Sequence, residues 1–115
     1  MLTNLADIAR SAGLKVIETN GWKTRGHGTM GAVKAIVCHH TASAAGSNAN
    51  SLGTVTNGRP DLAGPLCNYL LARDGTVYTI AGGVAWHAGA TIDDSLYSNS
   101  HAIGIEAENN GVNEK

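Results

Sequence analysis

The chain has 115 residues, and 8 Lys and Arg side chains against 9 Asp and Glu give it a formal net charge of −1. This balance provides no basic footprint for nucleic acid and no polybasic patch for a membrane surface. No apolar run approaches the length needed to insert into a membrane. The length fits a single domain spanning residues 1–115, with one hydrophobic core.

The first residues and the two cysteines indicate where the protein is made and whether it contains a disulfide. Residues 1–12 lack the basic start and long apolar centre of a secretory signal, so we expect a protein made in the cytoplasm. Cys38 and Cys67 fit neither a disulfide framework nor a CxxC metal knuckle. Both lie in apolar runs, which favours two buried free thiols, although a bridge between neighbouring strands stays open.

The first elements are a helix and a short strand. Apolar residues at helical spacing predict an amphipathic helix over residues 3–12, with Gly13 as its stop. Residues 15–18 form a brief strand candidate. The Asn20-Gly21 pair that follows is a turn signal of the hairpin type.

A glycine-rich loop leads into a histidine-bearing strand. Residues 24–32 are too rich in glycine to be regular, and His27 within them is expected to be a solvated surface residue, with a position at the rim of the site as the alternative. The apolar run from Ala35, ending in His39 and His40, predicts a buried central strand. Alternation along a strand sends the two histidines to opposite faces of the sheet.

The middle of the chain contains the clearest hairpin. Residues 41–50 are small and polar, as in a surface loop or a poorly formed helix start. Residues 66–71 and 76–80 then form two strand candidates joined by a turn at Arg73-Asp74-Gly75.

The last strand completes the fold prediction. Residues 102–108 place isoleucines on one face and Gly104, Glu106 and Glu108 on the other. A leading helix with several strands of mixed type predicts an α/β domain with a single mixed central β-sheet flanked by helices.

Three polar features stand where strands end or leave the sheet: His39, the Trp86-His87 pair and Glu106. Neutral imidazole is a preferred ligand of zinc, which lowers the pKa of a bound water and polarises a carbonyl. A carboxylate beside that water can pass its proton to a leaving amine. A histidine and a glutamate from separate strands are therefore what metal-assisted hydrolysis needs, although this spacing alone is a weak signal.

Four sequence blocks carry a resemblance to a known family. They are Val-Cys-His-His-Thr-Ala at 37–42, Asn-Tyr-Leu-Leu-Ala-Arg-Asp-Gly-Thr-Val-Tyr at 68–78, Ala-Trp-His-Ala-Gly at 85–89 and Ile-Gly-Ile-Glu at 103–106. In this order they resemble the type 2 N-acetylmuramoyl-L-alanine amidases, which include phage endolysins and peptidoglycan recognition proteins. The resemblance implies an amidase/peptidoglycan recognition protein-like fold and a zinc hydrolase that cuts the bond between N-acetylmuramic acid and L-alanine in peptidoglycan.

The resemblance also implies roles for individual residues. His39 matches the first zinc-binding histidine, and Glu106 matches the glutamate proposed as general base in cell-wall-recycling amidases. Asn68, Trp86 and His87 match positions at the substrate groove, where we expect contact with the muramyl peptide.

Two departures from the family pattern matter. Cys67 stands where many relatives have a catalytic tyrosine, which shifts the expected weight onto Glu106. The family's second zinc histidine and third ligand normally follow the strand that holds Glu106, and no matching segment precedes Lys115. Three explanations stay open: this is the N-terminal part of a domain completed by a C-terminal segment or a second chain, His87 or His101 substitutes as a ligand, or the chain binds peptidoglycan without cutting it.

Together these residues favour a zinc amidase of the cell-wall-lytic kind, similar to a phage endolysin. We expect such a protein to act on the bacterial cell wall during host lysis after synthesis in the cytoplasm. The alternative is a non-catalytic peptidoglycan-binding module or an inactive fragment.

Overall fold

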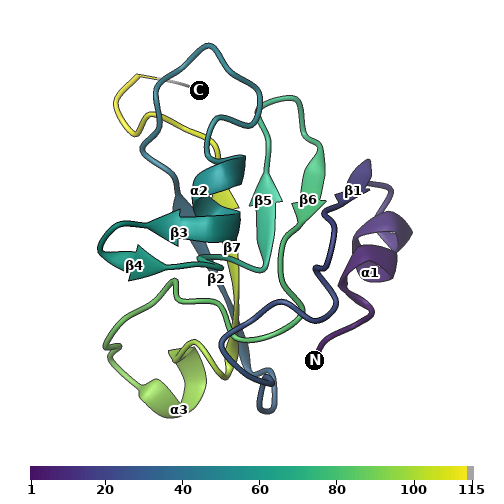
Figure 1. Cartoon of the computed structure of the whole chain (residues 1–115), viewed down its shortest axis with the longest axis vertical. Helices are drawn as coiled ribbons and strands as arrows, with labels where there is room; N and C mark the ends of the chain where they lie inside the picture. Colours follow the sequence, from purple (N-terminus) through teal and green to yellow (C-terminus); the bar gives the residue numbers. More distant parts are fainter. Residues whose placement is uncertain (114–115) are drawn as a thin grey trace.

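The computed structural model describes residues 1–113 and forms a mixed sheet with helices packed against it (Figure 1). Its elements in chain order are α1 (Leu5–Ser11), β1 (Val16–Glu18), β2 (Ala35–His40), α2 (Leu52–Asn57), β3 (Gly58–Arg59), β4 (Leu62–Ala63), β5 (Tyr69–Leu71), β6 (Val77–Thr79), α3 (Asp94–Tyr97) and β7 (Ala102–Ala107). The main sheet has the order β1-β6-β5-β7-β2, and β3 and β4 pair separately. Only β5 and β6 run antiparallel within the main sheet, so the predicted mixed α/β architecture is confirmed.

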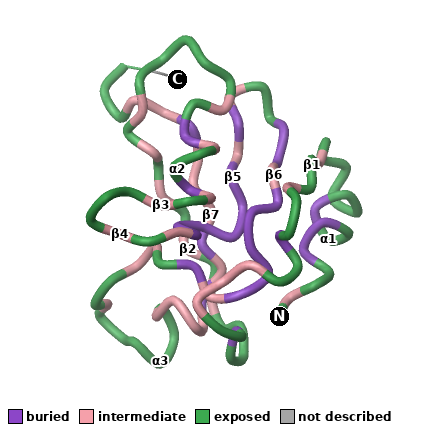
Figure 2. The backbone as a smooth tube through the Cα atoms, in the orientation of Figure 1, coloured by how far each residue is buried: buried purple, intermediate pink, exposed green. Residues whose placement is uncertain are grey.

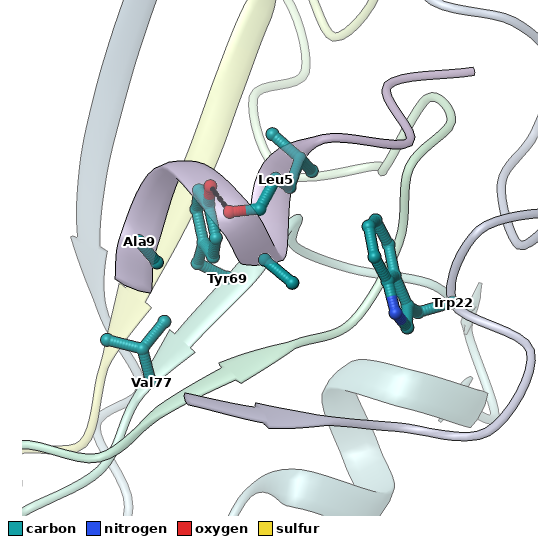
Figure 3. Close-up of a cluster of buried hydrophobic side chains, with 6 residues drawn as sticks. Leu5, Ala9, Trp22, Tyr69 and Val77 are labelled. Carbon is teal, nitrogen blue, oxygen red and sulfur yellow. Dashed lines mark hydrogen bonds between the residues drawn. The ribbon is translucent and has the colours of Figure 1, made fainter. Parts of the chain in front are cut away.

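Helix α1 covers one face of the sheet. The helix predicted over residues 3–12 is confirmed, and its buried side chains join a cluster with residues of β5 and β6 (Figure 3). The Tyr69 hydroxyl crosses this cluster and donates to the backbone carbonyl of Leu5 at 2.6 Å. The core of this layer consists of Leu5, Ala6, Ala9, Trp22, Tyr69 and Val77.

Helix α2 covers the other face. Alternation along β5 turns Leu70 away from the Tyr69 layer, into a second cluster that includes Val55 of α2. The other buried members are Leu66, Cys67, Ile80 and Ala81. Neither α2 nor the β3–β4 pair was predicted from the sequence. None of the helices within residues 1–113 is long and apolar enough to cross a membrane.

The predicted hairpin is confirmed over shorter strands, β5 and β6. The Asp74 carboxylate accepts from the Thr76 backbone amide at 2.9 Å, and Gly75 adopts a φ of 87°, so this turn needs its glycine. The hairpin expected at Asn20-Gly21 is wrong, because β1 leads into a turn and pairs in parallel with β6.

The prediction that the histidine-bearing strand is buried and central is also wrong. β2 is an edge strand that pairs only with β7 in the described sheet, and its residues alternate between half-buried and exposed. Ile36 is 63% exposed and Cys38 is exposed, whereas Cys67 is fully buried. Both cysteines are free, as predicted. The predicted burial is confirmed for Cys67 and wrong for Cys38. Figure 2 shows how burial is concentrated on β5 and β6 and declines towards β2.

Candidate functional site

The centre of the candidate site is formed by two neighbouring parallel strands. His39 of β2 and Glu106 of β7 are register partners. Register partners in a parallel pair point to the same face, and this is the face that α2 covers further along the sheet. His40 lies on the opposite face and is exposed, as alternation predicted. Strand pairing thus brings together the two residues predicted as metal ligand and general base.

Glu106 opens into a cleft of about 160 Å³ between the ends of β2 and β7 and helix α2. Burial, and secondarily the negative charge of Glu108, raises the pKa of Glu106 from 4.5 to about 7. A carboxyl group with this pKa exchanges protons readily near neutral pH. The cleft is lined by His40, Thr41, Ser51, Thr54, Val55, Arg59 and Leu66 as well as Glu106.

Cys67 lies close to Glu106. Its side chain is fully buried in the α2 cluster. Burial, and then the negative charge of Glu106, raises the pKa of the Cys67 thiol well above its ordinary value. Cys67 is therefore a neutral neighbour of Glu106 and not a nucleophile.

His87 reaches the same place from the loop after β6. Its Nδ1 lies 3.3 Å from Nε2 of His39, and its Nε2 lies 3.2 Å from the carbonyl oxygen of Ala102. Gly104 makes this approach possible, because a Cβ at that position would collide with the imidazole ring of His87. Burial lowers the pKa of both His39 and His87, which favours their neutral forms. The sequence indicated substrate contact for His87 and left open a role as a substitute ligand, but its contact with His39 was not predicted.

Trp86 remains at the surface, 40% exposed, beside a groove that Leu62, His87 and Asn99 also line. The ring of His27 stacks on Trp86 with centroids 3.6 Å apart. His27 is therefore not a solvated surface residue but lies at the rim, the alternative that the sequence left open, and supports an aromatic platform there. A stacked pair of flat rings suits contact with a sugar or peptide face, so Trp86 is well placed for its predicted role.

Asn68 has a different environment from the groove residues. It is fully buried, and its side-chain amide donates to the carbonyl oxygens of Ala81 and Gly83 at 3.0 and 2.9 Å. Its side-chain oxygen accepts from the Gly104 backbone amide at 2.9 Å. This position gives no support to substrate contact by Asn68. Its side chain joins β7 to the segment that leads towards His87.

The donor set fits zinc only in part. His39 and His87 offer neutral imidazoles, which zinc prefers. Among residues 1–113, no group of three or more His, Cys, Asp and Glu side chains could hold a metal ion. His101 is not part of this region, because it precedes β7 and its Nδ1 lies 2.9 Å from the carbonyl oxygen of Ala32.

An ion pair that was not predicted from the sequence anchors the loop before α2, whose residue Ser51 lines the cleft. Arg73 donates to the buried Glu108 carboxylate at 3.0 Å, and Ser43 Oγ and the Ser51 backbone amide donate to the same group at 2.8 and 2.9 Å. Arg73 also donates to the carbonyl oxygen of Ser47 at 2.6 Å. The loop before α2 is thereby fixed to the β5–β6 turn. Asp74-Gly75 explained the turn, but only the contact with Glu108 identifies Arg73 as an anchor.

Comparison with known proteins identifies the family. A family model described as N-acetylmuramoyl-L-alanine amidase matches residues 29–115, which is most of the chain. The chain belongs to this amidase family. No match was found among curated proteins or among solved structures. The amidase family acts on peptidoglycan, and the matched region includes β2, β7 and the loop that carries Trp86 and His87.

Proposed function

We propose that this chain forms the catalytic face of a zinc-dependent amidase that hydrolyses the bond between N-acetylmuramic acid and L-alanine in peptidoglycan. The observation that carries the proposal is the pairing of His39 with Glu106 on one sheet face, with Glu106 opening into a cleft. Membership of the amidase family supports the substrate class.

In this proposal Glu106 is the general base and His39 is a zinc ligand. A zinc ion at His39 would supply Lewis-acid polarisation of the scissile carbonyl and lower the pKa of an attacking water. Glu106 would take a proton from the attacking water and return it to the leaving amine of L-alanine. In the protein without metal, burial and the charge of Glu108 raise the pKa of Glu106 to about 7, so its carboxyl group exchanges a proton near neutral pH.

Trp86 and the cleft provide the substrate-binding part of the proposal. The exposed Trp86 ring, backed by His27, would contact the muramyl peptide as it enters beside His87. Because peptidoglycan is a cell-wall polymer, we further propose that the protein acts on bacterial walls and has the lytic role of an endolysin.

Replacing Glu106 tests the catalytic assignment. Glu106→Gln should lower the rate at which L-alanine amino termini are released from purified peptidoglycan by about 10²–10⁴-fold. The substitution removes the general base but keeps the shape of the side chain. Zinc content should not change. Glu18→Gln is the matched control, since Glu18 lies on β1 at the other edge of the sheet. Unchanged hydrolysis by Glu106→Gln would sink the assignment.

A non-catalytic peptidoglycan-binding module is the second candidate. It is favoured by the lack of a group of three metal-binding side chains within residues 1–113. This candidate predicts co-sedimentation of the protein with peptidoglycan, no release of amino termini and no stoichiometric zinc. Zinc retained at one equivalent by the 115-residue chain after dialysis would argue against it.

A further inference from the structure

The Asn20-Gly21 pair is a hairpin signal in the sequence, but β1 forms no hairpin and pairs in parallel with β6. The same two residues stand next to each other twice more, at 57–58 and 110–111. Asparagine followed by glycine readily loses its side-chain amide. The reason is that the glycine backbone nitrogen can approach the asparagine side chain without hindrance from a side chain of its own. The contacts of each pair in the fold decide which of the three can react.

The pair at residues 57–58 is enclosed at the end of helix α2. At this C-terminal cap, Gly58, the backbone N–H donates to the carbonyl oxygen of Thr54. Gly58 also packs against the backbone of residues 62–64 so closely that a Cβ would collide with it. The Gly58 nitrogen can therefore reach the Asn57 side chain only after these contacts open.

The pair at residues 110–111 is held by hydrogen bonds at the atoms that would react. The Gly111 backbone N–H donates to the side-chain oxygen of Asn109 at 2.7 Å. The side-chain oxygen of Asn110 accepts from the backbone amides of Val112 and Asn113, at 2.9 and 3.1 Å. These bonds keep the Gly111 nitrogen and the Asn110 side chain engaged elsewhere.

The Asn20-Gly21 pair has neither kind of protection. Both residues are exposed in the turn after β1. Among residues 1–113, neither the Gly21 backbone N–H nor the Asn20 side chain has a hydrogen-bond partner. The two reacting groups are thus free to meet in the folded protein.

Arg25 places a positive charge at this peptide group. Its guanidinium donates to the backbone carbonyl oxygen of Asn20, and also to Thr19 Oγ1 and the Ile80 carbonyl oxygen, at 2.9 and 2.6 Å. The Asn20 carbonyl and the Gly21 nitrogen belong to one conjugated peptide bond. When the nitrogen loses its proton, the negative charge therefore spreads to the oxygen that Arg25 bonds. A charge-assisted hydrogen bond at that oxygen stabilises the anion more than the neutral amide.

We propose that Asn20 is a site of spontaneous deamidation in the folded protein, with Arg25 promoting loss of the proton from the Gly21 backbone nitrogen. Solvent base takes this proton, and the nitrogen forms a bond to the side-chain carbonyl carbon of Asn20. The bond from that carbon to Nδ2 breaks, and ammonia leaves with a proton from water. One water molecule then opens the resulting succinimide at either carbonyl carbon. The product is aspartate or isoaspartate, and no atom is oxidised or reduced.

Peptide mass spectrometry of protein incubated near neutral pH measures the conversion of each asparagine separately. In the folded protein, Asn20 should convert at least about 10-fold faster than Asn57 or Asn110, since each of those pairs must first lose hydrogen bonds by local opening. In urea, where all three are unfolded, the rates should become similar. Conversion of Asn57 or Asn110 in the folded protein as fast as that of Asn20 would overturn the proposed site.

Arg25→Gln tests the role of the charge, because glutamine can still donate a hydrogen bond. Deamidation at Asn20 in the folded protein should slow about 5-fold, the effect of a unit charge about 4 Å away in a solvent-like dielectric. The rate in urea should not change. Lys23→Gln is the matched control, since it removes a cation from the same turn whose ammonium lies over the Trp22 ring. It should leave the rate nearly unchanged.

Hydrogen exchange of the Gly21 amide separates the charge effect from loosening of the turn. Base-catalysed exchange passes through the same amide anion, and this N–H has no hydrogen bond to lose. Arg25→Gln should therefore slow Gly21 exchange by a similar factor even if the turn becomes more mobile. Unchanged or faster Gly21 exchange in Arg25→Gln would overturn the role of Arg25.

Discussion

At the scale of single residues, Glu106 shows how the fold gives an ordinary side chain an unusual property. Strand pairing places its carboxyl group over the α2 layer, where solvent is partly excluded, and Glu108 adds a second negative charge. Both effects disfavour the ionised form. The sequence identified Glu106 from its motif, but its raised pKa depends on which strand lies beside β7.

The raised pKa of Glu106 makes stability depend on pH. Between pH 4.5 and about 7 the unfolded chain loses this proton while the folded chain keeps it, so stability falls as pH rises through that window. Glu106→Gln should remove this fall and be more stable than the unmodified protein at pH 8, by on the order of 1–3 kcal/mol. Urea unfolding at pH 4 and pH 8 with a chelator present measures it.

The control for this prediction is Glu18→Gln. Hydrogen bonds from Trp22 and then Arg10 lower the pKa of Glu18, so its replacement should leave the fall between pH 4.5 and 7 in place. An equal fall in the Glu106→Gln protein would show that another group is responsible.

At the scale of elements, β7 can accommodate the ring of His87 because it has a glycine, Gly104, between its two isoleucines. Gly104 is buried under the ring of His87. Gly104→Ala should push the ring away, break the contact between His39 and His87, and destabilise the fold by about 1–3 kcal/mol. Gly53→Ala is the matched control, since a Cβ there has no neighbour within 4 Å and Ala suits helix α2. Thermal unfolding and NMR of His39 check both; an unshifted His39 signal in Gly104→Ala would contradict the packing.

The anchor of the loop before α2 gives a second prediction at this scale. Arg73→Met leaves the Glu108 carboxylate buried without its cation, and should cost about 3–5 kcal/mol of unfolding free energy. Arg10→Met removes a cation whose partner Glu18 is exposed, and should cost at most about 1 kcal/mol. Urea unfolding of the two variants compares them. Equal costs would mean that the buried pair does not hold the loop.

Some elements of the fold could be predicted from the sequence and others could not. Local patterns predicted α1, the β5–β6 hairpin and β7, since helical spacing, turn residues and strand alternation are written in neighbouring positions. They failed for β2, because edge or centre depends on the order of strands in the sheet. They also missed α2, whose six residues include glycine and two threonines and have a single buried side chain, Val55.

The residues of the candidate site could likewise be predicted only in part from the sequence. Family blocks indicated His39, Glu106 and Trp86, and the fold places the first two side by side. The contact of His87 with His39 spans 48 residues of chain, and the anchor between Arg73 and Glu108 spans 35. Contacts of such range depend on the packed sheet, and no spacing rule in the sequence gives them.

At the scale of the whole molecule, the two sheet faces are covered unequally. Helix α1 packs over β5 and β6, and the same face continues to Ile103 and Ile105, which are half-buried. Their register partners on β2, Ile36 and Cys38, are exposed. Within residues 1–113, burial on this face therefore decreases from β6 towards the edge strand β2 (Figure 2).

The two free thiols can be used to test this difference in burial. Cys38 lies on the exposed edge strand β2, whereas Cys67 is buried in the cluster under α2. A thiol reagent should modify one cysteine of the native protein within minutes and the second only after unfolding, since reaction needs an accessible thiolate. Cys38→Ser should abolish the native reaction, and Cys67→Ser should leave it unchanged. Protection of Cys38 that disappears on dilution would instead show that chains associate through this face. Native modification of Cys67 would contradict the packing of α2 on the sheet.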